Sequence, residues 1–181
     1  MKKLLIGAIV GGILVFGWQT ASWTFLNLHG KEMQQAKNQD SILNYLNTQF
    51  SEDGQYVIPR ANDNASQKEM EDFQKTMTGK PWAVVTYHKA YKADMVMSGI
   101  RGILSTILGV LFVCWVLMKQ TSVSFGTTFI SCILIGIAGY LYIPYAGHIW
   151  MQVPGAMKNF IDVLISWGLC GLWLGWWLNR K

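Results

Sequence analysis

Long apolar stretches without charged side chains are the feature that most restricts how this 181-residue chain can fold. A helix that crosses the hydrocarbon core of a bilayer needs about 20 mostly apolar residues, because each residue adds about 1.5 Å to a span of about 30 Å. Four segments meet this length, and we predict that each forms a transmembrane helix. The segments are residues 4–26, 95–118, 125–146 and 156–178.

The composition excludes several other classes of protein. Only 14% of the residues are charged, whereas about 25% are charged in an average soluble domain. Nine of the ten acids lie between Glu32 and Asp94, so the remaining chain could not present a soluble surface. The basic residues flank apolar segments instead of forming a stripe, which argues against nucleic-acid binding. Three cysteines are too few for a disulfide-rich scaffold.

The first apolar segment has two interpretations. Lys2 and Lys3 followed by an apolar run are typical of a secretory signal peptide. Residues 19–22, however, offer no small-x-small cleavage site, and the apolar character continues to Leu26. We therefore expect an uncleaved membrane anchor. Gly7 and Gly11 would let another helix approach closely, or they reflect only the high frequency of glycine in spanning helices.

Lysine and arginine in short loops set the orientation of a multi-pass chain. A cytoplasmic N-terminus places five basic residues inside and leaves only Lys158 in the short outer turn. We therefore expect both termini in the cytoplasm, the chain in a bacterial inner membrane, and residues 28–94 exported. The five inner basic residues are Lys2, Lys3, Lys119, Arg180 and Lys181.

Residues 28–94 predict a small water-exposed α/β domain. The pattern indicates a helix over residues 39–50, a strand over 54–59, a helix that begins at a Ser66/Glu69 capping box, and a strand over 81–88. This order would pair the two strands in parallel, with a right-handed crossover and helices on one side of the sheet. Two strands and two short helices bury little apolar area. We therefore expect the domain to pack against the membrane helices or against another protein.

Two ionisable side chains fall inside predicted spans, where a charge costs about 2.5 to 3.5 kcal/mol on insertion scales. Arg101 and Asp162 lie at a similar depth near the outer ends of their helices. Each belongs to a polar stripe at helical spacing. Gln19 and Ser22, three residues apart on the first span, lie at a similar depth and could join them. This intramembrane polar patch comprises Arg101, Asp162, Ser98, Ser105, Asn159, Ser166 and Gln19.

Three interpretations of this patch remain open. Arg101 and Asp162 could form an ion pair that joins the second and fourth spans, which is the interpretation we favour. Each could instead reach separately to the outer headgroups, or the patch could serve as a proton or ion site.

The histidines and cysteines give weaker indications of a functional site than the intramembrane polar patch does. His29, His88 and His148 all fall near the outer boundary, yet none shows close ligand spacing, so we predict no metal site and no cofactor. The cysteines are odd in number and lack a CxxC motif, which favours a role as small apolar side chains in the helix packing.

Two strings carry a resemblance. GKPWAVVTYHK (residues 79–89) and SWGLCGLWLGWW (residues 166–177) resemble a group of small, uncharacterised bacterial four-helix integral membrane proteins with an exported loop after the first helix. The resemblance implies a multi-pass bacterial membrane protein and brings no activity and no functional residues.

We expect a non-catalytic accessory or scaffold subunit in the lipid bilayer. Its exported domain would contact a protein partner, or the chain would form a homo-oligomer through its Gly-rich helix faces. One alternative is a small oligomeric transporter or channel that uses Arg101 and Asp162. Another is a membrane enzyme that acts on lipid or quinone through His148, His88 or Asp162 at the outer boundary.

Overall fold

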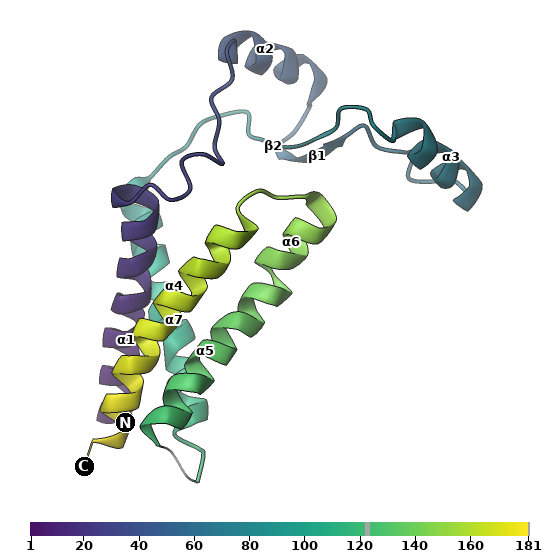
Figure 1. Cartoon of the computed structure of the whole chain (residues 1–181). Coiled ribbons are helices and arrows are strands. Elements are labelled where there is room, and N and C mark those ends of the chain that lie inside the picture. Colours follow the sequence, from purple (N-terminus) through teal and green to yellow (C-terminus); the bar gives the residue numbers. More distant parts are fainter. Residues whose placement is uncertain (122–123, 181) are drawn as a thin grey trace. The chain divides into compact units, whose positions relative to one another are not determined.

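The computed structural model of the protein describes residues 1–121 and 124–180, and the chain divides into two compact units (Figure 1). Unit 1 lies within residues 1–35 and 94–181, and unit 2 comprises residues 36–93. Each unit is described by itself below.

Unit 1 contains four helical stretches that are each long and apolar enough to span a membrane, which confirms the predicted number of such helices. The first stretch starts as an α-helix and ends as a π-helix, and the third is interrupted once. The stretches are α1 (Lys2–Thr20) with η1 (Ala21–Phe25), α4 (Met95–Leu117), α5 (Phe125–Tyr142) with α6 (Pro144–Met151), and α7 (Ala156–Asn179).

The break between α5 and α6 follows from Pro144. A proline ring has no N–H to donate and clashes with the carbonyl four residues earlier, so it begins a new helix. Beyond α6, Gln152 and Gly155 both have a positive φ, and Gly155 caps the start of α7. The Tyr140 hydroxyl donates a 2.8 Å hydrogen bond to the Ala156 carbonyl, which fastens α5 to this first turn.

Helix α1 packs against both α4 and α7, and α7 also packs against α5. Glycines permit the close approach of α1 and α4, because a Cβ at Gly12 would lie 2.6 Å from the Cα of Ile107. A Cβ at Gly11 would lie 3.2 Å from Cys170 Sγ on α7. Gly11 and Gly12 of α1 are therefore covered by neighbouring helices of the same chain.

Two indole groups fix the register of α1 against α7, which lie side by side in Figure 1. Trp173 Nε1 donates to the Gly7 carbonyl at 3.1 Å, and Trp177 Nε1 donates to the Lys3 carbonyl at 2.7 Å. The buried core of unit 1 is apolar. Its buried members are Val15, Val110, Val113, Cys114, Leu117, Cys132, Cys170 and Leu174.

Unit 2 has the two helices and two strands that the sequence predicts. The elements are α2 (Gln39–Gln49), β1 (Gly54–Ile58), α3 (Gln67–Met77) and β2 (Ala83–Tyr87). The capping box of α3 is confirmed, because the Ser66 hydroxyl accepts from the Glu69 amide while the Glu69 carboxylate accepts from the Ser66 amide.

The predicted parallel pairing of the strands is wrong. The strands β1 and β2 are antiparallel, with Gly54 opposite Tyr87 and Ile58 opposite Ala83. A parallel pair needs a crossover whose helix packs back over the sheet. Helix α3 has no buried residue, so it does not cover the sheet, and the connection simply returns the chain in the opposite direction.

A small aromatic cluster is the core of unit 2. The ring of Phe50 stacks on Tyr56 at 3.8 Å and meets the edge of Tyr87 at 5.3 Å. Tyr87 also donates from its hydroxyl to the Asn47 side chain at 2.8 Å. Only Phe50 and Tyr87 are buried among residues 36–93, so this unit has little apolar core of its own.

Candidate functional site

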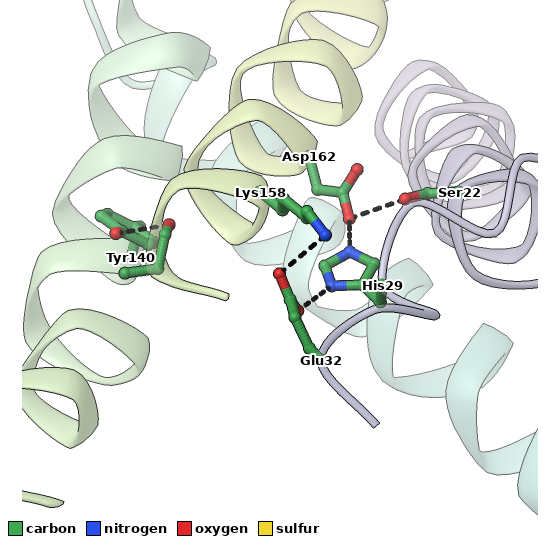
Figure 2. Close-up of polar contacts among 7 residues, drawn as sticks. Ser22, His29, Glu32, Tyr140, Lys158 and Asp162 are labelled. Atoms are coloured by element: carbon green, nitrogen blue, oxygen red, sulfur yellow. Dashed lines mark hydrogen bonds and ion pairs between the residues drawn. The ribbon is translucent and has the colours of Figure 1, made fainter. Parts of the chain in front are cut away.

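Asp162 is the centre of a polar network in unit 1. It lies in the second turn of α7, is 8% exposed, and contacts three polar side chains. Trp18 Nε1 donates to Oδ1 at 3.0 Å, and the Ser22 hydroxyl donates to Oδ2 at 2.9 Å. His29 Nε2 lies 2.8 Å from the same Oδ2 (Figure 2). The burial of this carboxylate is therefore compensated by several hydrogen bonds.

His29 connects Asp162 to a second carboxylate. The imidazole is 2% exposed and stacks on Trp23, with the ring centroids 4.1 Å apart. Its Nδ1 lies 3.0 Å from Glu32 Oε2 while its Nε2 faces Asp162 (Figure 2). Each nitrogen of this buried ring thus faces a carboxylate oxygen.

The chemistry of these three side chains limits how both contacts of His29 can be hydrogen bonds. An ionised carboxylate only accepts hydrogen bonds, and a neutral imidazole carries one N–H. Both contacts are hydrogen bonds only if His29 is an imidazolium or if one of the two acids is protonated.

Lys158 completes the network on the side of Glu32. It precedes Asp162 by four residues, which places both side chains on one face of α7. Its Nζ lies 3.1 Å from Glu32 Oε1. Burial opposes ionisation of Glu32, but the contacts with Lys158 and His29 outweigh it and lower the pKa of this carboxyl. With an imidazolium at His29, two cations alternate with two anions and the formal charges cancel.

Gly155 makes room for Glu32. A Cβ at this position would overlap the Glu32 carboxylate. The φ of Gly155 is also +90°, a conformation that L residues rarely adopt. Both observations explain why glycine stands at the start of α7.

The expected pair of Arg101 and Asp162 is not formed in the described part of the chain. The partners of Asp162 are Trp18, Ser22 and His29, which α1 and the segment after η1 supply. Helix α4 faces α1 through Gly102, Ile107 and Val110. The stripe on the other side of α4 is exposed, and it comprises Ser98, Arg101 and Ser105.

The other members of the predicted patch lie together. Gln19 on α1 and three polar residues of α7 line one cavity of about 550 Å³, together with Trp23 and Trp167. The three residues are Asn159, Asp162 and Ser166. The cavity is confined to the end of the helices near His29, because the next level of α7 inward is filled by the buried Cys170 and Leu174.

The three histidines lie in different surroundings. His29 belongs to the network, and His148 donates from Nδ1 to the Val153 carbonyl at 2.9 Å. His88 lies in unit 2, where its Nδ1 is 3.4 Å from Asp53. Across residues 1–121 and 124–180, no group of three or more histidine, cysteine, aspartate or glutamate side chains is arranged to hold a metal ion.

Known proteins give no further guide to this site. Comparisons of the chain with protein-family models, with curated proteins and with solved structures found no match.

The sequence indicates Asp162 and its partner Ser22, but it does not indicate Trp18 or His29 as partners. The sequence indicates His29 only as one of three histidines near the outer boundary, Glu32 only as one of the nine clustered acids, and Lys158 only as a basic residue at that boundary. Two spacings could have indicated the network: Trp18 and Ser22 are four residues apart, as are Lys158 and Asp162. Each spacing places two polar groups on one helix face.

Proposed function

We propose that the chain is a multi-pass protein of a bacterial inner membrane and serves as a non-catalytic accessory or scaffold subunit. In this proposal both termini are cytoplasmic, residues 28–94 are exported, and the exported domain binds a protein partner. The observation that carries the proposal is the small core of unit 2, in which only Phe50 and Tyr87 are buried.

Apolar side chains on α2 support the partner contact. Asn47 and Phe50 connect this helix to the strands, whereas Leu43 is 56% exposed and Tyr45 is 65% exposed. Covering such side chains with another protein removes apolar surface from water, which favours binding.

The polar network supports a structural role over a catalytic one. Asp162 accepts from Trp18 and Ser22 and contacts His29, and both nitrogens of His29 face carboxylates. A general base or a nucleophile must be free to reach a substrate. The network instead joins the segment after η1 to the first turns of α7.

The placement of charge supports the proposed orientation. The basic residue near the proposed outer boundary is Lys158, which lies in the first turn of α7, and its charge is compensated by Glu32 at 3.1 Å. Labelling of single introduced cysteines tests this orientation, because the native thiols are buried. A membrane-impermeant maleimide added to intact spheroplasts should label Lys68→Cys and spare Gln120→Cys. Labelling of Gln120→Cys alone would contradict the orientation.

Purification in mild detergent followed by mass spectrometry tests the proposed role. We expect a stoichiometric chain of different sequence to accompany the intact protein. The variant Tyr45→Ser should lose this chain, whereas Tyr91→Ser, which removes an exposed aromatic side chain outside α2, should retain it. A purified protein without an unlike partner would contradict the scaffold proposal.

Transport by an oligomer is a second candidate, and the polar cavity around Gln19, Asn159 and Ser166 is the observation that favours it. The same mass measurement separates the two candidates, because an oligomer would contain copies of this chain alone.

A further inference from the structure

A second groove lies at the other end of unit 1, between the start of α1 and the end of α7. Its volume is about 470 Å³. Three of its five lining side chains are basic, and the other two are apolar or aromatic. The lining residues are Lys2, Lys3, Ile6, Trp177 and Arg180.

The positive charge of this groove is not compensated by a carboxylate side chain. In the described parts of unit 1, no Asp or Glu forms an ion pair with its three basic residues. Asp162 precedes Arg180 by 18 residues on α7, which corresponds to about 27 Å along a helix. Glu32 and Asp94 belong to the same distant end of the helices, because they follow the end of η1 and precede the start of α4.

Packing and hydrogen bonds hold the groove together. Lys3 Nζ donates to the Arg180 carbonyl at 2.7 Å, and Trp177 Nε1 donates to the Lys3 carbonyl. The Arg180 guanidinium lies 5.3 Å from the ring centre of Trp176 and 6.0 Å from that of Trp177. The groove thus has a fixed aromatic wall beside its cations, an arrangement that suits the boundary between headgroups and acyl chains.

We infer that this groove binds the headgroup of an anionic phospholipid. Lys2 and Arg180 contact the phosphate, while Ile6 and Trp177 contact the first carbons of the lipid. Basic pockets between membrane helices on the cytoplasmic side recognise phosphate headgroups in this way. The inference rests on the proposed membrane insertion and orientation, and it does not depend on a protein partner.

The test uses the full chain in nanodiscs that contain equimolar phosphatidylglycerol and phosphatidylcholine. Native mass spectrometry of the released protein measures which lipid remains bound. We expect enrichment of phosphatidylglycerol, and we expect Lys2→Gln and Arg180→Gln each to reduce that enrichment roughly five-fold, since one basic residue near the surface contributes about that factor. Lys3 is left unchanged because it connects α1 to α7.

Lys119→Gln is the matched control. It removes one positive charge from the loop between α4 and α5, where Lys119 lies over Trp115 at 5.6 Å and outside the groove. The enrichment should stay within two-fold of the unmodified protein. An equal loss in Lys119→Gln would overturn the inference, because a general attraction to basic residues would then account for the binding.

Two further outcomes would also overturn it. Equal retention of the two lipids by the unmodified protein would show that the groove does not select negative charge. Loss of the bound lipid on addition of inorganic phosphate would show that the groove is a site for free anions. Failure of the chain to enter nanodiscs would instead contradict membrane insertion, so the two failures are distinguishable.

Discussion

His29 Nε2 lies 2.8 Å from Asp162 Oδ2, although the two residues are 133 positions apart in the chain. The contact joins the segment that leaves the first helical stretch to the second turn of α7. It takes the place of the expected contact between Asp162 and Arg101. The two contacts differ in their consequences. The observed contact depends on the buried imidazole of His29, whereas the expected one would depend on the exposed guanidinium of Arg101.

Removal of the Asp162 charge should destabilise the protein. In Asp162→Asn the imidazole of His29 loses a buried anionic partner, and breaking a buried pair on one side costs about 3 to 5 kcal/mol. The unfolding temperature in detergent should therefore fall clearly, whereas Arg101→Gln, at an exposed position of α4, should change it little. A larger loss in Arg101→Gln would contradict the network.

A double-mutant cycle measures the contact itself. If His29 and Asp162 interact as described, His29→Gln combined with Asp162→Asn should cost less than the sum of the single variants, with a coupling energy of about 0.5 to 3 kcal/mol. Additive losses would show that the two side chains do not interact.

Gly155→Ala should destabilise unit 1 for two reasons. Its Cβ would overlap the Glu32 carboxylate, and its φ of +90° is strained for alanine. We expect a loss of about 1 kcal/mol or more. Combination with Glu32→Ala should recover the part due to overlap. Gly139→Ala on α5 is the control, because a Cβ there meets no other atom within 4 Å, and its unfolding temperature should not fall.

Acid should weaken the network through Glu32. The contacts with Lys158 and His29 hold the pKa of this carboxyl below its ordinary value of 4.5. Ionised Glu32 therefore contributes stability above pH 4.5, and this contribution is lost as the pH falls through the lowered pKa. Thermal unfolding of the intact protein as a function of pH should show this loss.

Two glutamine variants isolate that effect. Glu32→Gln should be less stable at neutral pH and should lose less stability on acidification than the unmodified protein. Glu52→Gln, at an exposed position of unit 2, should retain the acid response. An unchanged acid response in Glu32→Gln would show that another group is responsible.

Cysteine pairs test the antiparallel strands of unit 2. Gln55 lies opposite Thr86 in the observed register, so Gln55→Cys with Thr86→Cys should form a disulfide on mild oxidation. A parallel pairing that placed Gly54 opposite Ala83 would instead bring Gln55 opposite Val84. The pair Gln55→Cys and Val84→Cys should therefore stay reduced. Disulfide formation is followed by the gel mobility of a protease fragment. Rapid oxidation of this second pair would contradict the structure.

The sequence by itself determined the four apolar helices, the capping box at Ser66 and the special status of Asp162. These features depend on composition and on spacing within one segment, because helix length, amphipathic pattern and capping are local properties. The sequence also showed Gly7 and Gly11 as points of close approach, without showing which helix approaches them.

Tertiary structure alone decided which groups meet. Helix α1 packs between α4 and α7, so Trp18, Ser22 and His29 reach Asp162, while Arg101 is left on the exposed side of α4. The direction of β2 likewise depended on whether α3 packs on the sheet. A buried charge takes the partners that folding brings within hydrogen-bond distance, and that distance depends on the packing of segments far apart in the chain.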